Sequence, residues 1–217
     1  MAIKIYSKKK DGDKKLAPHF MVWEFGCRGT DVIKIDTRLP KYLEKIRTYV
    51  MKYSKSASVT ITSGYRDPAE NRRVGGSSNS RHLTGRAVDV NVYRNGERIP
   101  SYMIMCIAQL MRFIGIGFIS KTAAHLDFKT GSNYRYDETK FAGGFFLQFA
   151  DCFEYFKPTM YVRGTNGAPY RRSAKTSAKV VGKIKDGTKV TVYRQEGAFL
   201  YIGDGRYVHK RWLGFWK

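Results

Sequence analysis

The sequence predicts an α+β domain followed by a small all-β unit. In the first part, apolar residues recur at helical spacing in two segments and alternate with polar residues in several others. Near Pro158 the composition shifts, and the rest shows only short strand-like segments separated by turn pairs such as Asp186-Gly187. We therefore expect one domain over residues 1–157 and a second over residues 158–217.

Two helices are expected in the first domain. One covers about residues 39–54, where leucine, isoleucine, valine and methionine recur at helical spacing between charged residues. The other begins after Pro100, a residue that suits the first turn of a helix, and runs to about Phe113. Each helix carries one apolar stripe.

Three strands are expected around these helices. Residues 58–63 and 87–93 alternate with a period of two and are rich in β-branched side chains, and a third strand lies around residues 125–128. The alternation places Asp89 on the polar face of the second strand and His125 on the polar face of the third.

Two segments give weaker signals. Residues 1–22 read as a lysine-rich N-terminal stretch with a turn at Lys10-Asp11-Gly12-Asp13. Residues 134–156 are rich in aromatic side chains. We interpret them as a linker, with packing into the first domain as the alternative.

The charge points to a polyanionic partner. The chain carries 40 Lys and Arg against 18 Asp and Glu, a net charge of +22. Nucleic acid, anionic lipid and anionic bacterial wall polymers all meet this description. No helix-turn-helix, zinc-finger or aromatic RNA-binding pattern is present, so we expect no specific nucleic-acid binding.

The cysteines and the hydropathy indicate whether to expect disulfide bonds, a membrane-spanning segment or a signal peptide. The three cysteines are far apart and form no C-x-x-C pair, which favours reduced thiols. No apolar run reaches about 18 residues, so no transmembrane segment is expected. The N-terminus has no apolar stretch behind its charges, and we expect no secretory signal peptide.

A metal site is the sharpest functional signal. His82, Asp89 and His125 form a two-histidine, one-carboxylate set, which suits a catalytic zinc with a fourth position for water. Zinc so bound lowers the pKa of its water and polarises a scissile carbonyl. This assignment assumes that the two strands lie side by side. The other histidines, His19 and His209, are expected to be structural or surface residues.

Asp127 and Arg66 are the candidate catalytic residues. On a strand, Asp127 faces the same side as His125 at about 7 Å Cα separation. It could handle protons as a general acid or base, or orient a histidine ligand, and both roles stay open. Arg66 follows a strand and a Gly-Tyr turn, where its guanidinium suits a carboxylate or a developing oxyanion.

Two motifs carry a resemblance. Residues 62–76, Thr-Ser-Gly-Tyr-Arg-Asp-Pro-Ala-Glu-Asn-Arg-Arg-Val-Gly-Gly, and the following Ser80-x-His82-x-x-Gly85-x-Ala87-x-Asp89 resemble the zinc D-alanyl-D-alanine carboxypeptidase family. That family includes VanY-like carboxypeptidases and phage L-alanyl-D-glutamate endolysins, and shares a fold with the hedgehog signalling domain. The resemblance covers residues 15–130 and implies helices packed on an antiparallel sheet.

The resemblance also implies roles for individual residues. It implies zinc bound by His82, Asp89 and His125, Arg66 as a substrate or transition-state contact, and Ser80 as a substrate-binding pocket residue. Several branches carry Glu or Asp three residues before the last histidine, or His two before it. Thr122 and Ala123 stand there in this chain, which instead resembles the branch with His-x-Asp.

The C-terminal unit resembles a bacterial SH3-like wall-binding domain. The matching segments are residues 161–163, 177–192 and 199–208, and another kind of small β-barrel is the alternative.

These features together predict a peptidoglycan hydrolase that cleaves a stem-peptide amide bond with zinc-activated water, as a D,D- or L,D-type carboxypeptidase or endopeptidase. The expected partners are peptidoglycan and anionic wall polymers. A phage or prophage endolysin, made in the host cytoplasm and released by a holin, or a tail-associated lysin fits these properties. The alternative is a catalytically inactive, zinc-containing wall-binding module.

Overall fold

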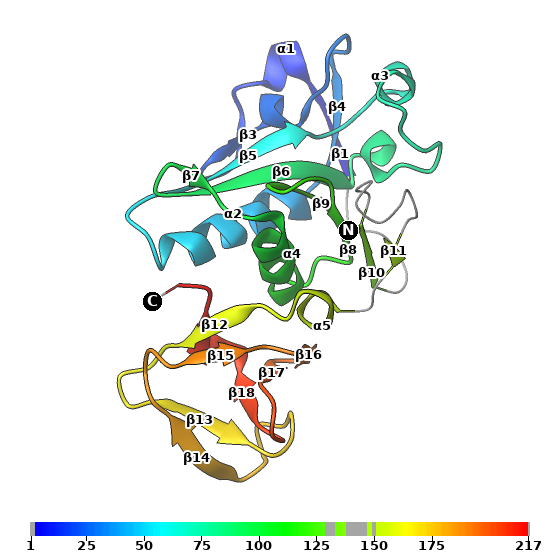
Figure 1. Cartoon of the computed structure of the whole chain (residues 1–217). Helices are drawn as coiled ribbons and strands as arrows, with labels where there is room; N and C mark the ends of the chain where they lie inside the picture. Colours follow the sequence, from blue (N-terminus) through cyan, green and yellow to red (C-terminus); the bar gives the residue numbers. More distant parts are fainter. Residues whose placement is uncertain (1–2, 129–132, 138–146, 149–150, 217) are drawn as a thin grey trace. The chain divides into compact units, whose positions relative to one another are not determined.

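The computed structural model describes residues 3–128, 133–137, 147–148 and 151–216. The chain divides into two compact units, residues 1–148 and 149–217 (Figure 1). The division falls before α5 (Cys152–Phe156), whereas the change in composition pointed to 157/158. Asp151, the N-cap residue of α5, accepts a hydrogen bond from the Gln195 backbone at 2.8 Å. This bond holds the helix within the second unit.

The first unit is built on a seven-stranded sheet with the order β11-β10-β8-β9-β6-β5, and β7 pairs with β6 outside this path. Its strands are β5 (Ala57–Ser63), β6 (Ala87–Arg94), β7 (Glu97–Arg98), β8 (Gly115–Phe118), β9 (Ala123–Asp127), β10 (Tyr134–Asp137) and β11 (Leu147–Gln148).

The sheet corrects two expectations. Strands β8 and β10 run parallel, so the sheet is mixed rather than antiparallel, although its other neighbours are antiparallel. Residues 134–137, expected within a linker, form β10. Its residues Tyr-Arg-Tyr-Asp do alternate, but four residues are too few to separate a strand from an aromatic-rich loop by pattern alone.

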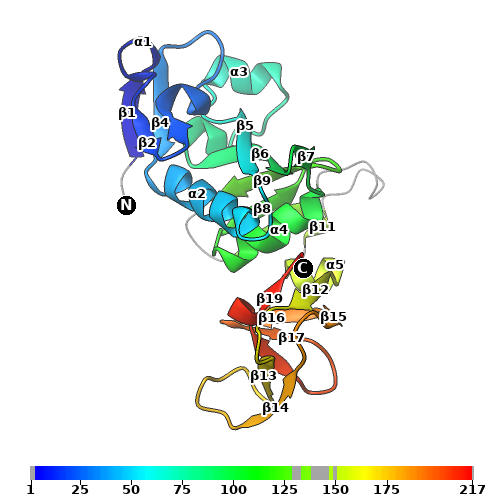
Figure 2. The ribbon, with the colours of Figure 1, turned by 90° about the vertical axis from the view of Figure 1, so that its left-hand side faces the viewer.

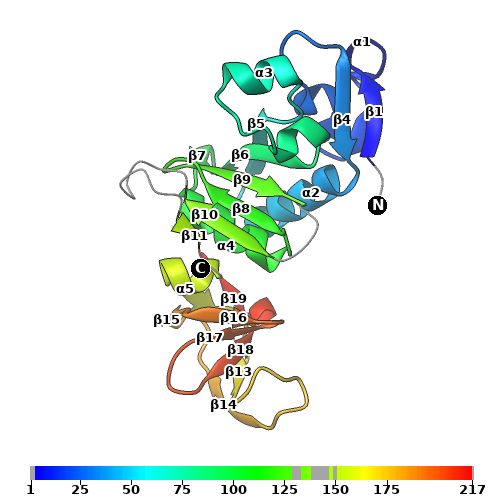
Figure 3. The ribbon, with the colours of Figure 1, turned by 90° about the vertical axis from the view of Figure 1, so that its right-hand side faces the viewer.

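Two helices cover one face of this sheet. Helix α2 (Arg38–Met51) contacts β5 and β6, and α4 (Ser101–Leu110) contacts β8 and β9. Figures 2 and 3 view the unit from opposite sides and place both helices on the same face. Val88, Val90 and Val92 are fully buried, so β6 contributes to the core with alternate residues. Asp89 and Asn91 point to the other face.

Shorter elements border the sheet. Strand β1 (Ile3–Ser7) pairs with β4 (Val32–Asp36), so the lysine-rich N-terminal stretch is structured. The connection between them contains α1 (Lys8–Asp11), β2 (Lys15–Ala17), β3 (Phe20–Met21) and the 3-10 helix η1 (Val22–Phe25). Between β5 and β6 lie α3 (Pro68–Arg73) and the 3-10 helix η2 (Arg81–Thr84).

The second unit is mostly β-structure. It has a three-stranded sheet, β15-β12-β19, and a five-stranded sheet, β14-β13-β18-β17-β16, in which neighbouring strands are antiparallel. The elements are β12 (Thr159–Val162), β13 (Ala168–Arg171), β14 (Val180–Ile184), β15 (Lys189–Thr191), β16 (Arg194–Glu196), β17 (Phe199–Tyr201), β18 (Tyr207–His209), η4 (Lys210–Trp212) and β19 (Leu213–Gly214).

Across the described ranges, no helix is both long and apolar enough to cross a lipid bilayer.

Candidate metal centre

Strands β6 and β9 bring two of the expected ligands together. They pair antiparallel, with Asp89 directly opposite His125. Residues opposite each other in an antiparallel pair point to the same face with Cβ atoms about 5 Å apart. The adjacency that the sequence left as an assumption is therefore present, and both side chains project from the face opposite the helices. Both are buried, each with 8% of its surface exposed.

The third residue, His82, comes from η2 rather than from the sheet. Gly85 ends η2 in the left-handed conformation with φ of 68°, and a Cβ there would collide with the Lys34 backbone. Only glycine allows this close turn into β6 without strain. The ring of His82 is 2% exposed, and its Nδ1 lies 2.6 Å from the carbonyl oxygen of Gly64.

Three ligand atoms converge at one point. His125 Nδ1 lies 2.9 Å from Asp89 Oδ1, and His82 Nε2 lies 3.2 Å from the same oxygen. The two ring nitrogens are 3.1 Å apart. Among the described residues, these three form the group whose ligand atoms lie close enough together to hold a metal ion.

The surroundings of each ring fit a zinc ion. In His82 the Nδ1–H donates to Gly64, which leaves the Nε2 lone pair for a metal. In His125 the Nε2–H donates to Asp127 Oδ2 at 3.2 Å, which leaves Nδ1 for the metal. Two imidazole nitrogens and one carboxylate oxygen are the donor set of catalytic zinc sites with an open fourth position.

Asp127 lies behind His125 rather than beside the converging ligand atoms. Its carboxylate is 2% exposed and packs against Gly115 on the neighbouring strand, where any Cβ would collide with it. Of the two roles considered for Asp127, this position fits orientation of the His125 ring. It faces the ring nitrogen on the side away from Asp89.

Arg66 holds the second oxygen of Asp89. Its Nη2 donates to Asp89 Oδ2 at 2.7 Å, and its Nε donates to Ser63 Oγ at 2.8 Å. The Arg66 backbone N–H also donates to the carbonyl oxygen of His82 at 3.2 Å. These bonds leave Asp89 Oδ1 facing the two histidines, and they place a guanidinium at the edge of the cluster.

The charges of the cluster stabilise one another. Burial alone favours the neutral forms, and it lowers the pKa of His82. In Asp89 burial is outweighed by hydrogen bonds from His125 and His82, which hold the pKa of the carboxyl far below its ordinary value. In His125 burial is outweighed by Asp127 and Asp89, which raise the pKa of the ring to about 10. The His125 ring thus lies between two carboxylates, with Asp89 at Nδ1 and Asp127 at Nε2.

The remaining candidates lie outside the cluster. Ser80 precedes η2, and within the described residues its side chain forms no hydrogen bond with the three ligands and no cap on η2. His19 is exposed and pairs with Glu44, and His209 Nδ1 accepts from the Arg211 backbone at 3.2 Å. Both histidines therefore have the structural or surface positions that the sequence suggested.

Sequence reasoning missed three residues that shape the site. Gly115 and Gly117 lie opposite Asp127 and His125 on β8. Gly117 leaves space for the ring of Tyr136, which packs 5.7 Å from the His125 ring, centroid to centroid. The signal was present as Gly115-Ile116-Gly117, two glycines at the spacing of one strand face, ahead of a strand with two functional residues at the same spacing.

Fold and site together fit a metalloprotein that could hold one zinc ion between two histidines and an aspartate. A family model for Peptidase M15 matches residues 16–127, which is more than half of the chain and spans all three ligand residues. The chain therefore belongs to the peptidase M15 family of zinc metallopeptidases. Comparison with curated proteins gave no significant match.

Proposed function

We propose that the chain is a peptidoglycan hydrolase that cleaves an amide bond of the stem peptide, as a D,D- or L,D-type carboxypeptidase or endopeptidase. The observation that carries this proposal is the convergence of His82, Asp89 and His125 in a domain of the M15 family. Each histidine already has a hydrogen-bond partner that turns its free nitrogen to the same point. Experiment must decide whether the chain cleaves as the VanY-like carboxypeptidases do or as the L-alanyl-D-glutamate endolysins do.

His82, Asp89 and His125 would hold the zinc ion. When bound there, zinc supplies Lewis-acid activation of a water molecule and of the scissile carbonyl. Asp127 accepts a hydrogen bond from the Nε2–H of His125 and so fixes the tautomer of the ring. Arg66 fixes the orientation of Asp89 and presents the rest of its guanidinium to a substrate carboxylate or a developing oxyanion. Ser80, before η2, is proposed as a substrate-pocket residue.

Proton transfer during hydrolysis needs a general base or acid. Asp127 reaches the reaction centre only through the His125 ring, because its carboxylate contacts Nε2 while Nδ1 faces Asp89. A ring whose Nδ1 binds a metal cannot relay a proton, so we propose that Asp127 supports the reaction by orienting the His125 ring and strengthening Nδ1 as a ligand.

We propose that the second unit is an SH3-like module that binds the bacterial wall. Two small antiparallel sheets support this assignment. Residues 160–217 carry 13 Lys and Arg against 3 Asp and Glu, and this excess of positive charge suits anionic wall polymers. A protein that both cleaves the stem peptide and binds the wall could act as a phage or prophage endolysin or as a tail-associated lysin.

The alternative is a zinc-containing wall-binding module without activity. It is favoured by Thr122 and Ala123, which stand where several branches of the resembling family carry an acidic residue or a histidine. The position of Asp127 behind His125 also favours it, because no carboxylate of the described residues other than Asp89 joins the ligand group.

Mass spectrometry of digested peptidoglycan tests the proposal. Purified Gram-positive walls are incubated with the zinc-loaded protein and with His82→Ala, and the released fragments are sequenced. New peptide termini with the unmodified protein alone would establish the activity and identify the bond. If the folded, zinc-loaded protein releases nothing from several wall chemotypes, the inactive wall-binding module is the better account.

A further inference from the structure

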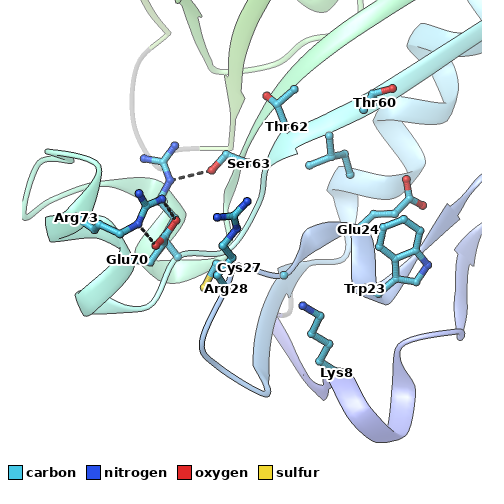
Figure 4. Close-up of a pocket in the computed structure, with 13 residues that line it drawn as sticks. Lys8, Trp23, Glu24, Cys27, Arg28, Thr60, Thr62, Ser63, Glu70 and Arg73 are labelled. Atoms are coloured by element: carbon cyan, nitrogen blue, oxygen red, sulfur yellow. Dashed lines mark hydrogen bonds and ion pairs between the residues drawn. The ribbon is translucent and has the colours of Figure 1, made fainter.

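A second feature of the first unit lies next to the metal centre. A cavity of about 670 Å³ opens between α1, η1 and β5. It is drawn in Figure 4, where the side chains of Lys8 and Arg28 point into the space between η1 and β5. Trp23 lies at one end and Arg73 with Glu70 at the other. None of the three metal ligands lines the cavity, so it is separate from the metal centre.

Arg66 connects the cavity to the metal centre. It is among the residues that line the cavity, and its Nη2 also donates to Asp89 Oδ2 at 2.7 Å. Ser63, which accepts from Arg66 Nε, lines the cavity as well. An extended ligand with its reacting group at the three ligands could therefore continue past Arg66 into this space.

The cavity has an excess of positive charge. Four of its lining residues are cationic and two are acidic. Both acidic side chains have partners in the protein: Glu70 pairs with Arg73 at 2.7 Å, and Glu24 accepts from the Met21 backbone at 2.7 Å. The hydrogen bond from Arg73 is the main cause of the lowered pKa of Glu70, and the positive charge of Arg28 lowers this pKa further.

Lys8 and Arg28 are the two other cationic residues that line the cavity. Within the described residues, neither side chain forms an ion pair or a hydrogen bond with another side chain, and both are exposed. Two such cations on the walls of one cavity are suited to bind a carboxylate. Trp23 is 52% exposed at the same cavity and offers an apolar surface beside them.

Lys8 also lies outside the part of the chain that the family model covers, which begins at residue 16. The cavity is therefore built in part by residues that the family model does not cover. Its position is fixed by two hydrogen bonds to Asp31, from the Lys9 backbone at 2.7 Å and from Ser7 Oγ at 2.7 Å.

We propose that this cavity is a subsite for a carboxylate-bearing residue of the peptide substrate. Arg28 and Lys8 bind the carboxylate, and Trp23 packs against the aliphatic part of the same residue. This inference rests on the proposed peptidase function and adds a charge preference at a distance from the cleaved bond. Arg28 and Lys8 are specificity-determining residues in this account, and they have no part in the chemical step.

The test pairs charge removal on the peptide with charge removal on the protein. The probes are a synthetic stem pentapeptide with free carboxylates and two analogues, each with one carboxylate converted to a carboxamide, at the second residue or at the C-terminus. The zinc-loaded full chain is compared with Arg28→Gln and Lys8→Gln. Lys10→Gln is the matched control, because Lys10 is an exposed lysine of the same short helix that does not line the cavity.

For the unmodified protein, one of the two carboxamide analogues is expected to lose about tenfold or more in kcat/KM, the equivalent of one charge-assisted hydrogen bond. Arg28→Gln should abolish this preference, Lys8→Gln should reduce it, and Lys10→Gln should keep it. Trp23→Ala should raise KM for all three peptides without changing the preference.

Two results overturn the inference in distinguishable ways. If the protein cleaves the peptides and the ratio of their kcat/KM values is the same in the unmodified protein and in Arg28→Gln, there is no carboxylate subsite here, and the peptidase function stands. If the unmodified protein cleaves none of the peptides and no peptidoglycan, the proposed function fails and the subsite fails with it.

Discussion

His125 is held from both sides. Its Nδ1 faces Asp89, its Nε2 faces Asp127, and the ring of Tyr136 packs beside it. A histidine can bind a metal through either nitrogen, and the partner of the other nitrogen decides which one is free. Asp127 therefore leaves Nδ1 as the nitrogen available for the proposed zinc ion, and the burial of both residues keeps the ring in place.

Replacement of Asp127 by asparagine tests this role. The amide can still accept a hydrogen bond from Nε2, but it lacks the negative charge that makes the His125 ring a better ligand. We expect Asp127→Asn to weaken zinc binding by about tenfold or more in a chelator competition assay. Asp13→Asn, an exposed aspartate of the first unit, is the control. A variant with full zinc affinity and no hydrolysis would contradict this role and identify Asp127 as the general base.

Gly115 is expected to be intolerant of any side chain. A Cβ at this position would collide with the buried carboxylate of Asp127. We expect Gly115→Ala to lower the free energy of unfolding by about 1–3 kcal/mol, measured by chemical denaturation. The double variant with Asp127→Ala should recover most of the loss, because the colliding group is gone. Equal destabilisation in both backgrounds would place the cause elsewhere.

At the scale of single residues, the sequence predicts three candidate ligands but not the groups that position them. The spacing of His82, Asp89 and His125 among small residues was enough to predict a zinc set. The role of Asp127 could not be decided, because a strand pattern gives the face of a side chain and not the ring nitrogen that it meets. Gly64 could not be foreseen as the partner of His82, since a backbone carbonyl leaves no trace in the sequence.

Helices and strands in which apolar residues recur at regular spacing were the most predictable elements. The helix expected over residues 39–54 is α2, Arg38–Met51, which ends three residues earlier than expected. The strands expected over residues 58–63 and 87–93 are β5 and β6, and their bounds agree to within one residue. Their pairing is a property of the tertiary structure. The parallel strand β10 was missed because its alternation of aromatic and charged residues spans only four positions, too few to predict a strand.

Helix α2 is tied to the N-terminal part of the first unit by Glu44. Its carboxylate is 3.0 Å from His19 Nδ1 and 2.7 Å from Arg47 Nε. Burial opposes its charge, but the hydrogen bonds from Arg47 and His19 lower the pKa of Glu44 below its ordinary value. A lowered pKa stabilises the folded state above the unfolded pKa of about 4.3, and this stability is lost as the pH falls through the folded pKa.

We therefore expect Glu44→Gln to be less stable than the unmodified protein at pH 7, by at most about 1 kcal/mol because the group is partly exposed. The difference should disappear as the pH falls below about 4. Denaturation curves at several pH values measure it. A difference that stays constant down to acidic pH would show that packing, and not charge, is the cause.

For the whole molecule, charge is distributed unevenly. Residues 1–159 carry 27 Lys and Arg against 15 Asp and Glu, whereas residues 160–217 carry 13 against 3. The second unit is therefore the more basic part for its size, and its attraction to a polyanionic wall depends on ionic strength.

Sedimentation with purified walls tests this attraction. We expect the bound fraction of the full chain to fall severalfold between low salt and about 0.5 M salt, because the Debye length then becomes shorter than about 5 Å. Walls stripped of teichoic acids should bind less at low salt, and they serve as the control for glycan and peptide recognition. Binding that is indifferent to both salt and teichoic acids would contradict an electrostatic contribution.

A crystal structure of the zinc-loaded protein, with anomalous data recorded at the zinc edge, tests the central claim most directly. The account predicts one strong anomalous peak about 2.0–2.2 Å from His82 Nε2, an Asp89 carboxylate oxygen and His125 Nδ1. Asp127 should remain hydrogen-bonded to His125 Nε2. A zinc ion bound through His125 Nε2 and Asp127, or no zinc at these residues, would contradict it.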